Sequence, residues 1–137
     1  MNKTFIIAEA GVNHNGSLEM AYQLVDAAME SGADAIKFQT FKAENLVTKG
    51  AEQANYQKKN IGKSTSQFEM LKGLELSYSD FKKIKQYCDR KNMKFLSTPF
   101  DLDSVDFLIH ELNLKVIKIG SGELTNAPYL YKIASSG

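Results

Sequence analysis

Hydrophobic residues along the chain alternate between two spacings, one typical of buried strands and one typical of amphipathic helices. Short, continuous apolar runs predict four strands, at residues 5–8, 33–38, 94–97 and 116–119. Apolar residues three and four positions apart predict helices that follow these strands, at about residues 18–31, 78–92, 105–112 and 127–135. A strand followed by a helix, four times over, predicts an α/β fold with a parallel sheet.

Several residues at the ends of these segments have the chemistry of caps and stops. Ser17 is placed to cap the first helix, and Gly32 provides its stop. Ser77 and Asp80 have capping-box spacing at the start of the second helix, and Pro99 ends the third strand. The boundaries therefore agree with the hydrophobic pattern.

Residues 41–67 do not fit this pattern, because they are polar, rich in lysine and without a clean period. We expect a long loop between the second strand and the next helix. Loops of this length inside compact domains are usually functional or disordered.

The length of the chain limits the architecture. The 137 residues suit one compact domain, and four strand–helix units make either an open sheet or half of a barrel. A complete (β/α)₈ barrel needs roughly 250 residues. If the fold is of the TIM-barrel type, residues 1–137 provide only about its first four units.

Composition and charge exclude several classes of protein. The chain is 43% hydrophobic and 24% charged with a formal net charge of +1, so no basic excess favours nucleic acid as a partner. No apolar run is long enough to span a membrane, and the start of the chain lacks the pattern of a signal peptide. The single cysteine, Cys88, is expected to be a buried structural thiol, which agrees with a reducing, cytoplasmic location.

The candidate chemistry lies where the predicted strands end. Lys118 lies in an apolar run and is followed by Gly120-Ser121-Gly122-Glu123. Because a buried charge without a partner is costly, we expect an anion near its ammonium group. Ile36-Lys37-Phe38 repeats the same frame two strands earlier. Because ligands bind beyond the carboxyl ends of parallel strands, we expect the following side chains to meet there: Glu9, Asn13, His14, Lys37, Gln39, Ser97, Thr98, Lys118, Ser121 and Glu123.

Each of these residues also has a structural interpretation. Glu9 could cap a loop, His14 could orient a turn, and the two lysines could extend to the rim of the sheet. Two lysines at one edge nevertheless favour function, since together with hydroxyl and amide donors they can hold a small dianion. The glutamates would repel that anion and are better suited to bind hydroxyl groups, activate water or approach a metal. The set of side chains suggests a phosphorylated carboxylate that meets a polyol.

Four sequence blocks then resemble one known family, the sialic acid (N-acetylneuraminate) synthases. The blocks, each at a strand end, are residues 7–16 (IAEAGVNHNG), 34–41 (DAIKFQTF), 95–101 (FLSTPFD) and 116–123 (VIKIGSGE). The resemblance extends from Phe5 to Ser135 and includes Gln67-Phe68-Glu69-Met70-Leu71.

The resemblance implies a TIM-barrel transferase that forms a carbon–carbon bond between phosphoenolpyruvate and an N-acetylated amino sugar such as N-acetylmannosamine, releasing phosphate. It implies that Lys37, Thr98, Lys118 and Ser121 bind phosphoenolpyruvate, that Glu123 meets the sugar, and that Glu9 lies near the metal or the reacting water, with Gln39 beside it. It also implies a divalent metal, Mn²⁺ or Mg²⁺, and a homodimer.

This chain departs from the family in what it lacks. The family's metal-binding histidines lie in later strands, so no metal ligand is expected within residues 1–137, and His14 is not one of them. The family's C-terminal antifreeze-like domain, which in the family dimer lends an arginine to the partner's sugar site, is likewise not expected within residues 1–137. Asn60 is the nearest candidate for the family's sugar-binding loop asparagine, without a firm alignment.

Two alternatives stay open at this point. Lys118 could instead be the nucleophile of a Schiff-base aldolase. An isolated half-barrel could also be inactive and associate with itself through its open strand edges. The sequence leaves the amino sugar open between N-acetylmannosamine and its phosphorylated or diacetylated relatives.

Overall fold

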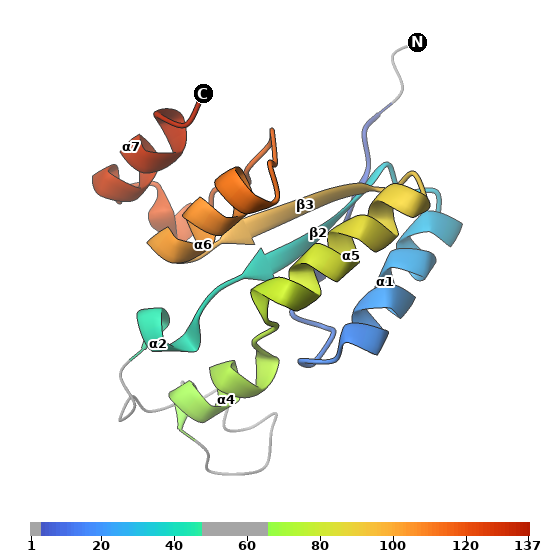
Figure 1. The fold of residues 1–137 in the computed structure, drawn as a ribbon, viewed down its shortest axis with the longest axis horizontal. Helices are drawn as coiled ribbons and strands as arrows, with labels where there is room; N and C mark the ends of the chain where they lie inside the picture. Colours follow the sequence, from blue (N-terminus) through green and yellow to red (C-terminus); the bar gives the residue numbers. More distant parts are fainter. Residues whose placement is uncertain (1–3, 48–65) are drawn as a thin grey trace.

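The protein, described by a computed structural model over residues 4–47 and 66–137, is built around a parallel three-stranded sheet. The strands are β1 (Ile7–Gly11), β2 (Ala35–Thr40) and β3 (Lys94–Pro99), in the order β1-β2-β3. All three run in the same direction, so their carboxyl ends share one edge of the sheet. Figure 1 shows the parallel course of β2 and β3. The predicted α/β class with a parallel sheet is confirmed.

Two helices cover one face of this sheet. Helices α1 (Leu18–Glu30) and α5 (Tyr78–Arg90) lie side by side against the strands (Figure 1). Their apolar stripes supply the core because residues three and four positions apart share one helix face. The core contains the buried residues Val25 and Ala28 of α1, Ile36 and Phe38 of β2, Phe81, Ile84 and Cys88 of α5, and Phe95 of β3.

The predicted caps of these two helices are confirmed. The Ser17 hydroxyl accepts a hydrogen bond from the Met20 amide, and the Ser77 hydroxyl accepts one from Asp80. Gly32 follows α1 with φ of +78°, a backbone conformation that glycine adopts without a steric penalty.

The first strand starts later than the hydrophobic run predicts. The carbonyl of Ile6 accepts hydrogen bonds from the amides of Asp34, just before β2, and of Ala35, the first residue of β2. Regular pairing with β2 therefore begins at Ile7 and includes Glu9. Phe5, Ile6 and Ile7 are about half exposed because this edge has no further strand among the described residues.

The prediction of a fourth strand is wrong for this structure. Residues 116–119 are not in a strand, and the segment contacts β3 through one long backbone hydrogen bond of 3.4 Å, from the Lys118 amide to the Ser97 carbonyl. An apolar run predicts burial, but a strand also needs a partner that aligns its backbone groups. Val116 is 59% exposed, which shows that its outer side is uncovered by the described residues.

The remaining helices agree with the hydrophobic pattern in position. The third predicted helix is α6 (Leu102–Asp106), and it continues into a π-helical turn, η1 (Phe107–Glu111). It begins before Val105 because the Asp101 carboxylate caps it by accepting from the Ser104 amide. The fourth is α7 (Ala127–Ala134), with the Asn126 side chain as its cap.

Two short helices border the long segment that was expected to be a loop. Helix α2 (Ala43–Leu46) and helix α4 (Gln67–Leu74) pack against each other (Figure 1), and residues 48–65 between them lie outside the described residues, as does Asn60. The Glu75 carboxylate accepts hydrogen bonds from the Ala43 amide and from the Lys42 and Lys72 ammonium groups. The expectation of an entirely irregular segment is wrong at 43–46.

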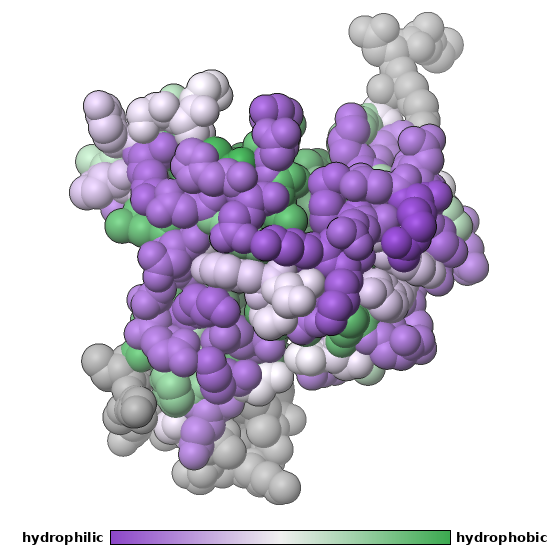
Figure 2. Space-filling view, viewed as in Figure 1, coloured by the Kyte–Doolittle hydropathy of each residue, from purple (hydrophilic) through white to green (hydrophobic). Residues whose placement is uncertain are grey.

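The surface is largely hydrophilic on the face that Figure 2 shows, with smaller hydrophobic patches between the helices. The outer side of α5 contributes exposed lysines that pair with acids, such as Lys82 with Glu111. Within the described residues, no helix combines the length and apolar character that crossing a bilayer requires.

Candidate functional site

The carboxyl ends of β1 and β2 bring two predicted site residues into direct contact. Glu9 and Lys37 face each other in the register and form an ion pair. Their neighbours Ala8, Ile36 and Phe38 pack with the core under α1 and α5, so Glu9 and Lys37 lie on the opposite face. The Lys37 side chain is 15% exposed and that of Glu9 is 47% exposed. The carboxylate thus neutralises the lysine that was expected to bind an anion.

A bulge after Glu9 brings Gln39 close to the same position. The register shifts between Glu9 and Gly11, and Gly11 has φ of +55°. A side chain at Gly11 would lie 3.3 Å from Oε1 of Glu9 and 3.6 Å from Nε2 of Gln39. The glycine therefore leaves room for these two side chains to converge, as predicted for neighbours at the strand ends.

Thr98 is buried at the end of β3 without a hydrogen-bond partner for its hydroxyl. The residue pairs in register with Gln39 and is 2% exposed, and its Oγ1 has no partner within the described residues. A buried hydroxyl that lacks a partner carries a desolvation cost, so such atoms often mark a ligand site.

The segment after β3 lies over Thr98. A Cβ atom at Gly120 would be 3.9 Å from Cγ2 of Thr98 and 3.6 Å from Cε1 of Phe100, which is ordinary van der Waals contact, so the segment packs directly against both side chains. Ser121–Glu123 forms the 3₁₀ turn η2, which is closed by the Glu123 amide bonding to the Gly120 carbonyl. The structure thus brings this turn beside β3, as the sequence predicted.

Lys118 and Ser121 are exposed next to this turn. The Lys118 ammonium group forms no ion pair with any residue in 4–47 or 66–137. It differs in this respect from Lys37, whose charge Glu9 offsets.

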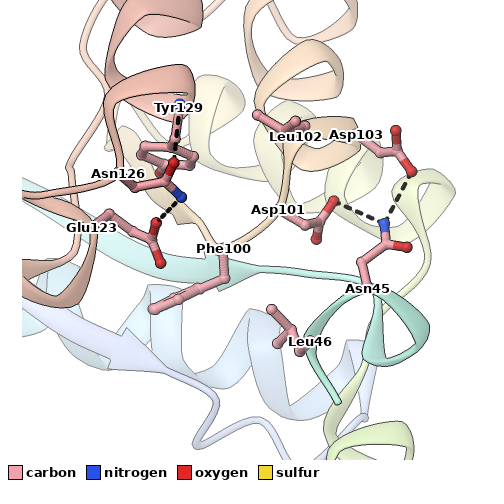
Figure 3. Close-up of a pocket in the computed structure, with 9 residues that line it drawn as sticks. All are labelled: Asn45, Leu46, Phe100, Asp101, Leu102, Asp103, Glu123, Asn126 and Tyr129. Atoms are coloured by element: carbon pink, nitrogen blue, oxygen red, sulfur yellow. Dashed lines mark hydrogen bonds between the residues drawn. The ribbon is translucent and has the colours of Figure 1, made fainter. Parts of the chain in front are cut away.

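Glu123 points into a pocket of about 600 Å³ beside the strand ends (Figure 3). Its Oε2 accepts a hydrogen bond of 2.7 Å from Nδ2 of Asn126. On the other side of the pocket, Nδ2 of Asn45 donates to Asp101 and to Asp103 (Figure 3). The lining is completed by Leu46, Phe100, Leu102 and Tyr129.

The buried ring of Tyr129 forms part of the pocket lining and is held in place by a hydrogen bond. Its hydroxyl donates a hydrogen bond of 2.7 Å to the Pro99 carbonyl at the end of β3. Burial, with the charges of Glu123 and Asp101, raises the pKa of Tyr129 to about 12, so the hydroxyl stays protonated at neutral pH.

His14 is buried in the turn after β1, where it holds the backbone of that turn. It is 1% exposed, and its Nδ1 accepts a hydrogen bond from the Gly16 amide. Burial lowers the pKa of His14 below its ordinary value, which keeps the ring neutral. Nε2 then carries the proton, and it has no partner within the described residues. The interpretation of His14 as a residue that orients a turn agrees with the Gly16 bond, and Asn13 lies in the same turn.

Two other residues named from the sequence are structural here. The Ser97 hydroxyl lies 2.7 Å from the Thr40 hydroxyl in the buried interior rather than at the ligand edge. Cys88 is buried in the core, and burial raises its thiol pKa to about 12, as expected for an unreactive thiol.

The described residues do not fit a metal ion by themselves. No group of three or more His, Cys, Asp or Glu side chains is arranged to hold one within residues 4–47 and 66–137. Asp101 is committed to other partners, since its carboxylate accepts from the Lys42 amide and from Ser104.

Sequence reasoning missed most of the pocket lining. Asn45, Asp101 and Asn126 come from three segments that are distant in the sequence and meet only in the fold. Asn126 had a usable signal, because an asparagine just before Ala127-Pro128 is a helix cap next to the Gly120–Glu123 turn. Asn45 had none, since it lies in the segment without a hydrophobic period.

The charges and donors of this edge separate into two regions. In the first region, Lys118 offers positive charge, and Thr98 and the exposed Ser121 offer hydroxyl donors, while the charge of Lys37 is offset by Glu9. The pocket beyond Glu123 offers carboxylates, amides and apolar side chains. Such an edge can hold a small anion next to an uncharged polar molecule.

Comparison with known proteins gives a consistent result over nearly the whole chain. The profile of the NeuB family matches residues 24–137. An N,N'-diacetyllegionaminic acid synthase of Legionella pneumophila is 57% identical over 131 residues, which cover 96% of this chain and 36% of that relative. The human N-acetylneuraminate-9-phosphate synthase is 37% identical over 97% of this chain and 36% of its own length.

A solved structure agrees with the fold. The N-acetylneuraminic acid synthetase of Leptospira borgpetersenii serovar Hardjo-bovis, crystallised in complex with citrate, superposes with a TM-score of 0.78 and 31% identity. The match covers 98% of this chain and 42% of that one. The chain thus spans little more than a third of the length of the curated relatives described above.

Proposed function

The chain belongs to the NeuB family, and from this premise we propose that it forms the first part of a synthase barrel that condenses phosphoenolpyruvate with an N-acetylated amino sugar. The products are a sialic-acid-type sugar and phosphate. The names of the relatives, legionaminic acid synthase and N-acetylneuraminate-9-phosphate synthase, support this reaction class.

The observation that carries the proposal is the buried Thr98 hydroxyl, which lacks a partner among the described residues. It lies at the end of β3, between the strand that carries Lys37 and the segment that carries Lys118. A phosphate or carboxylate oxygen bound between the two lysines would accept the hydrogen bond that Thr98 has to donate. We assign Ser121 to the same anion because its exposed hydroxyl lies in the turn beside Gly120.

The proposed reaction uses the two regions in turn. Carbon 3 of phosphoenolpyruvate attacks the aldehyde carbon of the open-chain sugar, and the carbonyl oxygen becomes a hydroxyl by taking up a proton. Water adds at carbon 2 and gives up one of its protons. The tetrahedral intermediate then expels phosphate: the bond from carbon 2 to the bridging oxygen breaks, the carbon-2 hydroxyl becomes a carbonyl, and its proton goes to the departing phosphate.

In this reaction Glu9 accepts the proton of the reacting water, with Gln39 orienting it, and Glu123 holds a sugar hydroxyl. Glu9 already contacts Lys37, so a bound anion would compete with this carboxylate for the lysine's ammonium group. A divalent metal, Mn²⁺ or Mg²⁺, stays a prediction from the resemblance. The described residues do not form a metal site by themselves.

The experiment that tests the proposal uses the full polypeptide encoded by the gene that contains this sequence. Phosphate release is measured with phosphoenolpyruvate and N-acetylmannosamine, together and separately. We expect release only with both substrates, and ¹⁸O placed in the bridging position should appear in the phosphate. Lys118→Met should raise the KM for phosphoenolpyruvate about tenfold or more, whereas the matched variant Lys132→Met, which removes a lysine paired with Asp106, should not.

The aldolase alternative predicts a different result. It requires a covalent lysine adduct with pyruvate that borohydride would trap, and no dependence on phosphate. Lys118 is exposed, whereas the lysine of such an enzyme is activated by an apolar pocket or a neighbouring cation. A trapped adduct at Lys118 would overturn the proposed function.

A further inference from the structure

We propose that the pocket beyond Glu123 binds the end of the acceptor sugar that is remote from the aldehyde, and that it selects an acceptor without phosphate. This inference rests on the proposed function, since it takes Glu123 as the residue that meets the sugar. It goes further by assigning Asp103 and the pocket around it to the choice between neutral and phosphorylated acceptors.

The charge of the lining is the first argument. Three carboxylates face the pocket, those of Asp101, Asp103 and Glu123, and none of the described lining residues is Lys, Arg or His. A phosphate dianion in this pocket would face like charges without a cation to balance them.

The ammonium group of Lys42, a residue that contacts the pocket lining, is committed elsewhere. Lys42 binds Asp101 only through its backbone amide, while its ammonium group pairs with Glu75 and lies over the Tyr78 ring at 4.2 Å. Positive charge near the strand ends comes instead from Lys118, on the proposed phosphoenolpyruvate side, since Glu9 offsets the charge of Lys37. This edge of the sheet therefore offers one region suited to an anionic substrate and a second region suited to an uncharged one.

The hydrogen-bonding capacity of the pocket is the second argument. Nδ2 of Asn45 already donates to Asp101 and Asp103, so this amide offers its oxygen to a ligand. Nδ2 of Asn126 donates to Oε2 of Glu123, which leaves Oε1 of Glu123 as a further acceptor. Acceptors outnumber free donors, and this favours ligands that donate, such as hydroxyl groups and the N–H of acylamino groups.

The apolar part of the lining is the third argument. Leu46, Phe100 and Leu102 lie between the polar groups (Figure 3), and Leu102 is 46% exposed although it is a large apolar residue. These side chains can contact the methyl group of an acylamino substituent or of a deoxy sugar, which a phosphate could not replace. With a volume of about 600 Å³, the pocket has room for such a substituent.

The test compares two acceptors that differ only in the phosphate, N-acetylmannosamine and its 6-phosphate, with the full polypeptide and phosphoenolpyruvate. We expect kcat/KM to favour the neutral sugar by about tenfold or more at low salt, with the preference shrinking as salt increases. Asp103→Asn removes one charge and keeps an oxygen that can accept from Asn45. It should reduce the preference about three- to tenfold, and Asp103→Lys should reduce it further.

Glu30→Gln is the matched control, because it removes an exposed carboxylate at the far end of α1, away from the strand ends. It should leave the preference unchanged. Circular dichroism spectra of the variants should match that of the unmodified protein. Equal use of both acceptors, a preference for the phosphate, or an unchanged ratio in both Asp103 variants would overturn the inference while the proposed function stands. Failure of both acceptors to release phosphate would overturn the proposed function itself.

Discussion

Thr40 and Thr98 are both buried threonines at the ends of neighbouring strands, but only one of them has a hydrogen-bond partner. The Thr40 hydroxyl lies 2.7 Å from that of Ser97. The Thr98 hydroxyl has no partner among the described residues. The difference separates a hydroxyl that stabilises the fold from one that is free to bind a ligand.

This contrast leads to a prediction for two matched substitutions by valine. Thr98→Val should leave the free energy of unfolding within about 0.5 kcal/mol, because no protein hydrogen bond is lost. In the full polypeptide it should weaken phosphoenolpyruvate binding about tenfold, the cost of one hydrogen bond to a charged ligand. Thr40→Val should do the reverse, with a loss of about 1–2 kcal/mol in stability and little change in binding.

Urea denaturation and the KM for phosphoenolpyruvate measure the two effects. If Thr98→Val destabilised the protein as much as Thr40→Val did, the Thr98 hydroxyl would have a structural partner and its role in binding would be withdrawn.

The loop after β1 packs against helix α4 at two glycines, Gly16 in the loop and Gly73 in the helix. A side chain at Gly16 would lie 2.4 Å from the carbonyl oxygen of Gly73, and Gly16 also has φ of +73°. The loop that carries His14 therefore rests directly on the backbone of α4. This contact connects the β1 end of the site with the element that follows the long segment after β2.

The close contact predicts a large cost for Gly16→Ala. Gly32→Ala is the matched control, because Gly32 has a similar φ of +78° but has nothing within 4 Å of the added methyl group. The control should lose about 1 kcal/mol of stability from backbone strain alone. Gly16→Ala should lose at least about 2 kcal/mol more, because the carbonyl of Gly73 cannot yield without moving α4. Equal losses in denaturant titrations would show that α4 moves away easily.

The elements of this fold were largely predictable, and their pairing was not. The helices from Leu18 and from Tyr78 follow from spacing and from serine caps, which are local properties. Residues 116–119 have the composition of a strand, but they lack the backbone partners that would make one.

The same limit applies to the site. Strand ends indicated which residues gather at one edge, because parallel strands share a direction. The ion pair of Glu9 with Lys37 depends on register and on the bulge at Gly11, and neither can be read from one sequence. The pocket needs Asn45 and Asn126 from segments that have no local signal in common.

At the scale of the whole molecule, the sheet leaves apolar side chains uncovered at both sides. β1 pairs only with β2 among the described residues, and Phe5, Ile6 and Ile7 before and in it are 46–51% exposed. On the other side, Val116 is 59% exposed. Strand edges with free backbone groups and apolar side chains are templates for pairing with another chain.

We therefore predict that the 137-residue chain, purified by itself, associates with further copies and does not catalyse the condensation. Size-exclusion chromatography with light scattering, over about 5–100 μM protein, should give a mass that increases with concentration. Ile7→Lys and Val116→Lys place a charge on the two uncovered sides and should shift the chain toward the monomer, because edge charges oppose strand pairing. Met29→Lys, which changes an exposed residue on the outer end of α1, should not. A monomer at the highest concentration would contradict association, and condensation by this chain would show that the described half-site is sufficient for the chemistry.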